Sequence, residues 1–250
     1  MEREKRQGSA PTDLGMNRTG VSTSPIDTPR MVDAAMSVPV IAEGAGEMVN
    51  MRRMYVEESP EPIGSMPPPV TPKGMAKTAV QAFKGHKPTV LLDKMGERLA
   101  FERTGTRLYD AMIVKVVGSP ETGVGPRHAD LEELRAEELR HFELVHRHLV
   151  RLGADPTVQT PCADTAGMQA MGVLQVLTDP RTTLSQCLNA ILTTELADTA
   201  GWELLTHLAR EAGETEMADE FQQAHLNEQE HDRRVKTWLT EMVMTDAGVA

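Results

Sequence analysis

Two short motifs of the form Glu-x-x-His are the residues of this sequence best suited to chemistry. Glu138 precedes His141 by three positions, and Glu228 precedes His231 by three. Residues three apart lie on one face of an α-helix, so each motif would present a carboxylate beside an imidazole. Both groups are ligands of transition-metal ions. One such motif alone is weak evidence, because Glu and His also stand together on solvated helix faces.

Two further glutamates strengthen the case for a metal site. Glu102 and Glu195 each lie within a stripe of apolar residues at helical spacing. A carboxylate that faces a helical core costs several kcal/mol unless it is paired, protonated or bound to a metal. The chain also repeats itself, since 36 residues separate Glu102 from Glu138 and 33 separate Glu195 from Glu228. Each half of the chain would then supply half of a metal pair.

One Glu from each of two helices, with a Glu-x-x-His from each of two others, is the ligand set of di-iron and di-manganese carboxylate bundles. The order of the motifs within residues 89–244 resembles the ferritin-like superfamily, and the two Glu-x-x-His pairs are similar to those of bacterioferritin, rubrerythrin and the di-iron oxidases. The chain differs from rubrerythrin in lacking a Cys-x-x-Cys pair, and no Met stands out as the haem ligand of a bacterioferritin. The resemblance implies that Glu138 and Glu228 bridge two Fe ions, with Mn as the alternative metal. The metal-binding and catalytic residues that it implies are Glu102, Glu138, His141, Glu195, Glu228 and His231.

Apolar periodicity predicts the elements that would hold these residues. Long helices are expected at residues 89–118, 130–152, 180–213 and 214–246. Thr89 is expected to cap the first helix, and Asp179, followed by Pro, is expected to cap the third. The last two helices must be antiparallel because almost nothing joins them, whereas residues 153–179 could cross the bundle and include a short helix at 168–177. The expected fold is an all-α, ferritin-like four-helix bundle with one long crossover between its second and third helices.

Residues 1–88 differ in composition from the rest of the chain. They hold eleven of the 16 prolines, including a Met-Pro-Pro-Pro run, and lack regular apolar spacing. A segment of this kind cannot bury enough apolar surface to offset the entropy of ordering it. We therefore expect a disordered segment at 1–88, followed by the bundle at 89–246. The open alternatives are a true start at Met31 or Met75 and a tail that docks on a partner.

The charge and cysteine content limit the partners and the compartment. The formal net charge of −11 argues against nucleic acid, because phosphate binding needs a basic face. No stretch reaches the roughly 20 apolar residues of a membrane helix. Cys162 and Cys187 are too few for a disulfide framework and favour a reducing compartment. A cytoplasmic protein without membrane attachment is expected.

Five residues near the motifs have a functional and a structural interpretation. Asp198 would accept a hydrogen bond from the outer nitrogen of a ligand histidine, or face solvent. His225 would be an extra ligand or proton donor, or an exposed residue near a helix start. Tyr109 would be an electron relay, or packing. Arg98 and Arg135 would balance the charge of the site, or face solvent.

Redox chemistry is the expected function. A pair of Fe or Mn ions in such ligands can pass two electrons to O2 or H2O2, so a ferroxidase or peroxide-reducing enzyme is preferred. The same ligands serve other reactions too. The alternatives are a di-iron oxygenase that acts on a small organic substrate and a non-enzymatic metal-storage or assembly module. The resemblance is compatible with a homodimer or larger oligomer.

Overall fold

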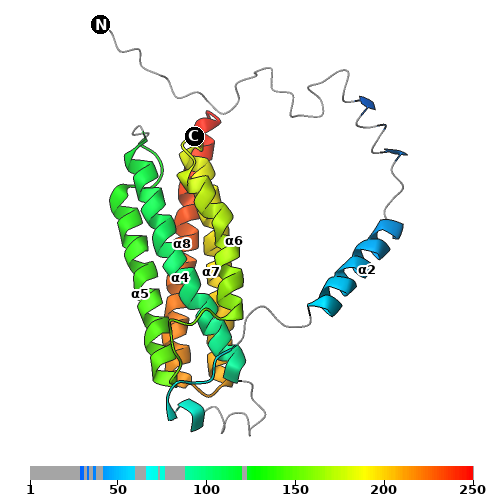
Figure 1. Ribbon diagram of the computed structural model, residues 1–250. Helices are drawn as coiled ribbons and strands as arrows, with labels where there is room; N and C mark the ends of the chain where they lie inside the picture. Colours follow the sequence, from blue (N-terminus) through cyan, green and yellow to red (C-terminus); the bar gives the residue numbers. More distant parts are fainter. Residues whose placement is uncertain are drawn as a thin grey trace. The chain divides into compact units, whose positions relative to one another are not determined.

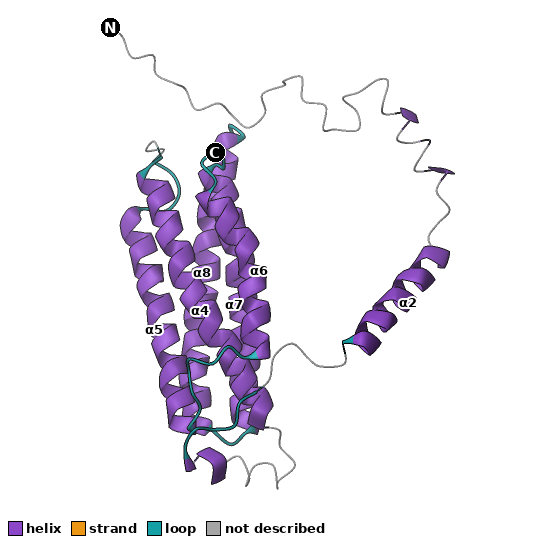
Figure 2. Ribbon diagram, in the orientation of Figure 1, coloured by secondary structure: helices purple, strands orange, loops and turns teal. Residues whose placement is uncertain are grey.

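The structure is a computed structural model of the 250-residue chain. It describes residues 29–30, 33, 36–37, 42–59, 66–72, 74–76, 88–119 and 123–249. The chain divides into two compact units, Met1–Glu61 and Pro62–Ala250. All regular secondary structure in the described residues is helical (Figure 2), which confirms the all-α class. In the part of the chain that the structure covers, no helix is both long and apolar enough to cross a membrane.

Helix α2 spans Ala42–Glu58 and belongs to the first unit. These 17 residues are helical, although they lie within the range 1–88 where disorder was expected. The prolines that dominate that range are absent from this stretch, so each residue keeps the backbone N–H that a helix interior needs. Much of the remaining segment lies outside the described residues.

Helices α4 and α5 carry the first half of the predicted ligands. α4 spans Pro88–Val117 and α5 spans His128–Leu152, and they run antiparallel (Figure 1). The cap expected at Thr89 is wrong, because the helix begins at Pro88, whose missing N–H is not needed in the first turn. α5 ends as expected before Gly153, which has a left-handed φ of 81° that glycine adopts without strain.

The connection between the two halves is itself helical. α6 spans Pro161–Thr178 and is longer than the short helix expected at 168–177. Thr160 caps it, since its Oγ1 accepts a hydrogen bond from the N–H of Ala163 at 3.3 Å, and the proline that follows occupies the first position. α6 packs against α4 and α7.

Helices α7 and α8 carry the second half of the ligands. α7 spans Leu184–Glu211 and α8 spans Thr215–Asp246, and they run antiparallel (Figure 1). The cap expected at Asp179 is wrong, because α7 begins four residues later than that cap implied. Thr183 caps it in a reciprocal arrangement with Gln186, in which each side chain bonds the other residue's backbone N–H.

Two apolar clusters fill the interior of the second unit. The first includes Met95, Leu99, Val145, Trp202 and Phe221, and the second includes Leu108, Met112, Leu134, Ile191 and Val235. On each of α4, α5, α7 and α8, the predicted ligands lie along the sequence between residues of one cluster and residues of the other. The polar residues therefore form a layer between two apolar layers.

A stretch before α4 also belongs to the second unit. The N–H of Val70 donates to the carbonyl of Gly153 at 2.9 Å, and Gly74 lies against the same end of α5. Met66 packs against the first apolar cluster. These contacts lie before the boundary expected at residue 89, so part of the proline-rich stretch covers one end of the helices.

Candidate metal centre

All six predicted ligands lie together in the interior of the second unit. Each is at most 4% exposed. One glutamate comes from α4, one from α7, and a Glu and a His come from each of α5 and α8. The helix repeat therefore brings the four motifs to one level, as their spacing predicted, in the cluster of Glu102, Glu138, His141, Glu195, Glu228 and His231.

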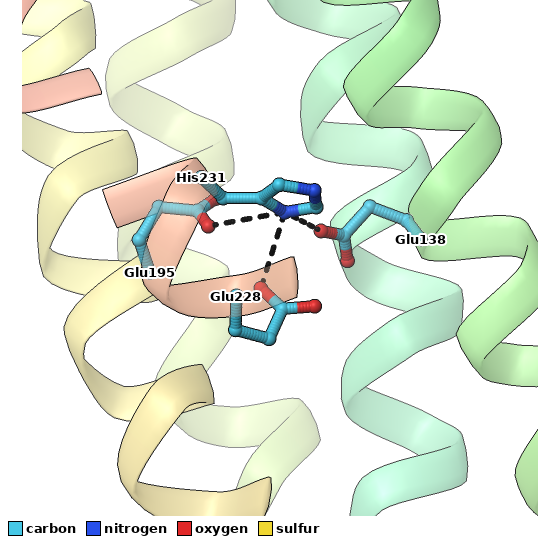
Figure 3. A group of neighbouring side chains, drawn as sticks. All are labelled: Glu138, Glu195, Glu228 and His231. Atoms are coloured by element: carbon cyan, nitrogen blue, oxygen red, sulfur yellow. Dashed lines mark ion pairs between the residues drawn. The ribbon is translucent and has the colours of Figure 1, made fainter. Parts of the chain in front are cut away.

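One part of the cluster surrounds His231. Its Nδ1 atom lies 3.2 Å from Glu228 Oε2, 3.3 Å from Glu138 Oε1 and 3.6 Å from Glu195 Oε2 (Figure 3). Two atoms that share one metal ion at about 2.1 Å each are about 3.0–3.4 Å apart at square or tetrahedral angles. The spacing of these donor atoms is thus close to that of a metal site.

The other part of the cluster surrounds His141. Its Nδ1 atom lies 2.6 Å from Glu228 Oε1 and 3.8 Å from Glu102 Oε2. Glu138 and Glu228 also fall in one group with Glu102, in which the donor atoms are within 4.8 Å of one another. Glu138 and Glu228 therefore face both parts of the cluster, while the other four residues each face one.

The hydrogen bonds of the cluster leave a regular set of atoms unpaired. Within the described part of the chain, both oxygens of Glu138 and both of Glu228 lack a hydrogen-bond partner, and so do Nδ1 of each histidine and Nε2 of His141. The remaining two glutamates, Glu102 and Glu195, each leave only Oε2 unpaired. A buried polar atom without a partner costs about 1–3 kcal/mol. A metal ion would satisfy these atoms, so the donor set fits one.

The Oε1 atoms of Glu102 and Glu195 each accept a hydrogen bond from a neighbouring side chain. The Tyr109 hydroxyl donates to Glu195 Oε1 at 2.7 Å, and Arg98 donates to Glu102 Oε1 at 3.4 Å. Tyr109 therefore contacts a predicted ligand and does more than pack. Burial, followed by the charge of Glu195, raises the pKa of Tyr109 well above its usual value, which keeps the phenol a neutral donor.

The outer nitrogen of His231 contacts Glu137, a residue that was not among the predicted site residues. Nε2 of His231 lies 2.5 Å from Glu137 Oε2, and Arg140 lies 3.1 Å from the other oxygen. The hydrogen bond to His231 lowers the pKa of Glu137. An acidic acceptor on a ligand histidine is a common arrangement, but no local signal in the sequence pairs Glu137 with a histidine of another helix.

The buried carboxylates shift one another's protonation. Burial raises the pKa of Glu102, Glu138 and Glu195, that of Glu138 to about 7. Burial would also raise the pKa of Glu228, but the two histidines lower it to about 2. Four carboxylates this close cannot all carry a charge unless cations balance them.

Asp198, His225, Arg98 and Arg135 each had two interpretations, and their contacts distinguish between them. Asp198 is buried and pairs with Arg98 rather than with His141 or His231. His225 is buried rather than exposed, and its Nδ1 lies 3.1 Å from the Thr199 carbonyl. Arg98 is buried beside the site, whereas Arg135 pairs with an aspartate at the surface.

A groove between α5 and α8 leads from the surface to His141. It encloses about 360 Å³, and its walls are mostly polar and charged side chains. The residues that line it beside His141 include Arg140, Leu144, Gln223 and Asn227. Small polar molecules and ions can therefore approach this side of the cluster.

No protein-family model matches this chain, and no curated protein or solved structure matches it either. The interpretation of the site therefore depends on its residues and their geometry.

Proposed function

We propose that the second unit is a ferritin-like four-helix bundle, formed by α4, α5, α7 and α8, that holds two Fe ions, with Mn as the alternative. The observation that carries this proposal is the number of unpaired oxygens on each glutamate. Glu138 and Glu228 each offer two, as a bridging carboxylate needs, and Glu102 and Glu195 each offer one. α6 is then the crossover between the two halves.

The unpaired atoms divide into two ion positions. Position 1 would take Glu195 and His231 as its own ligands, and position 2 would take Glu102 and His141. Glu138 and Glu228, which face both positions, would supply carboxylate oxygens to each. Mixed carboxylate and imidazole donors suit Fe(II) and Mn(II), and four donors leave room for a small reactant.

We further propose that the protein is a redox enzyme of the ferroxidase or peroxide-reducing kind. A pair of such ions supplies two electrons to O2 or H2O2. The two apolar layers keep bulk water from the centre, and the groove beside His141 gives small polar reactants a route toward it. Glu137 is partly exposed and contacts Nε2 of the fully buried His231. The proton that these two side chains share therefore lies at the edge of the site.

Anaerobic loading with Fe(II), followed by O2 or H2O2 in stopped flow, tests this reaction. We expect rapid Fe(II) oxidation by the intact chain and a loss of rate of about 100-fold or more in Glu138→Ala, because a proposed bridging ligand is missing and even residues behind a metal ligand contribute about 10- to 100-fold. Glu132→Ala is the matched control, since this glutamate lies on the same helix and is exposed. Loading with Mn and adding peroxide would instead release O2 if the centre were a catalase.

Two results would contradict the proposed reaction. One is Fe(II) that stays bound and is oxidised no faster than in the Glu138→Ala variant, which would favour storage or assembly. The other is oxidation that depends on an added organic substrate, which would favour an oxygenase.

A further inference from the structure

A buried ion pair lies beside one half of the cluster. Arg98 of α4 and Asp198 of α7 are 3% and 2% exposed, and Nη1 of Arg98 donates to Oδ1 of Asp198. The same nitrogen donates to Glu102 Oε1 at 3.4 Å. Arg98 therefore connects a residue outside the six to one of the proposed ligands.

The helix packing reserves space for this guanidinium. A Cβ atom at Gly201 would lie 1.7 Å from Nη2 of Arg98, so any side chain at that position would displace it. The guanidinium carbon lies 4.6 Å from the ring centre of Phe101 and 5.8 Å from that of Trp202, which is within the range of cation–π attraction. Arg98 is held in place from several sides.

The sequence repeat has no second copy of this pair. Arg98 stands four positions before Glu102, and the matching position before Glu195 is Ile191. Asp198 stands three positions after Glu195, and the matching position after Glu102 is Gly105. Glu195 accepts instead from the neutral hydroxyl of Tyr109. The two ion positions are thus alike in their ligands and different in the charges next to them.

Asp198 lies close enough to act as a ligand itself. One of its oxygens is within 4.8 Å of donor atoms of Glu102, Glu138 and Glu228. Its charge is neutralised by Arg98, and its Oδ1 is occupied by that residue's Nη1. If the guanidinium were absent, this carboxylate would add an oxygen donor and a negative charge beside position 2.

We propose that Arg98, held by Asp198, is a positioning residue that makes the two ion positions unequal. It occupies one oxygen of Glu102 and withholds Asp198 from coordination, so position 2 binds its divalent cation more weakly than position 1. The ion at position 2 would then exchange with ions in solution while the ion at position 1 stays bound. The inference rests on the proposed dinuclear centre.

Titration with Co(II) tests it, because the visible absorption of Co(II) reports the number of ligands. The intact chain should bind two ions in two separate steps. Arg98→Met should tighten the weaker step by about 10- to 100-fold, the usual range for residues behind a metal ligand, and should change the spectrum of that step to a higher coordination number. The stronger step should keep its affinity and spectrum.

Three further variants separate this role from a general effect on packing. Asp198→Asn should weaken the weaker step, because it leaves the guanidinium charge uncompensated. Combining it with Arg98→Met should return the affinity toward that of the intact chain. Arg98→Lys keeps the charge and should keep two unequal steps. Tyr109→Phe is the matched control and should alter the stronger step alone.

The outcomes distinguish this inference from the proposed function. Two ions bound by the intact chain with equal affinity, or a weaker step that Arg98→Met leaves unchanged, would overturn the inference and leave the dinuclear centre standing. Absence of Co(II) binding by the intact chain would overturn both. Thermal unfolding of each metal-free variant establishes whether it is folded. If Arg98→Met does not fold, the two single variants Asp198→Asn and Arg98→Lys carry the test.

Discussion

Neighbouring donors distinguish the four glutamates of the buried cluster. Glu102 and Glu195 each have one oxygen held by a donor from another residue. Glu138 and Glu228 keep both oxygens unpaired, as the proposed bridging role requires. The meeting of the six residues in one buried cluster was predictable, because helical spacing places motif residues on one face. Glu137 and the Arg98–Asp198 pair were harder to predict, because their contacts depend on how far one helix is shifted along another.

Gly105 leaves room for the side chain of Glu138, a proposed bridging ligand. A Cβ atom at this position would lie 2.1 Å from Oε2 of Glu138, so Gly105→Ala should displace that carboxylate. We expect metal affinity to fall by about tenfold or more, as measured by titration with Fe(II) under anaerobic conditions.

Gly172→Ala is the matched control for that substitution. Gly172 lies in α6, and a Cβ atom there would meet nothing within 4 Å. Alanine stabilises a helix interior by about 0.8–1 kcal/mol relative to glycine, so this variant should be more stable and bind metal normally. Equal metal affinity in the two variants would show that Glu138 does not need the space at Gly105.

The helices themselves follow from the apolar pattern, and their ends follow from the capping residues. The prediction placed the start of α7 at the Pro after Asp179 and did not weigh a second signal, the Thr183 that is followed three residues later by Gln186. The second is the true start, because it satisfies a backbone N–H at both positions. Asp179 instead binds Arg181 at the end of α6. Local sequence alone could not rank the two signals.

Thr183→Ala should destabilise the second unit through the loss of this cap. We expect a cost of about 1 kcal/mol, which is a drop of about 2–4 °C in Tm for a chain of this size. Thr193→Ala is the control, because Thr193 lies inside α7 and its hydroxyl donates to the helix carbonyl of Asn189. A Thr183→Ala variant as stable as this control would place the start of α7 elsewhere.

At the scale of the whole molecule, the second unit is more than the four helices that carry the proposed ligands. The Pro-rich stretch from Met66 packs against the end of α5 through Val70 and Gly153. Composition suggested disorder there, because a run of prolines resembles a linker until its contacts are known. The apolar layers above and below the cluster were predictable from the stripes on each helix, and they are what makes six buried polar residues costly without a bound cation.

Metal content is the measurement that tests the account most directly. After anaerobic reconstitution with Fe(II) and removal of excess metal, the chain should retain about two ions, and a His141→Ala, His231→Ala double variant should retain fewer than one. Reconstitution with Mn(II) is the parallel trial. If the intact chain retained neither metal, or if the double variant retained as much as the intact chain, the buried cluster would not be a metal centre and the proposed function would be wrong.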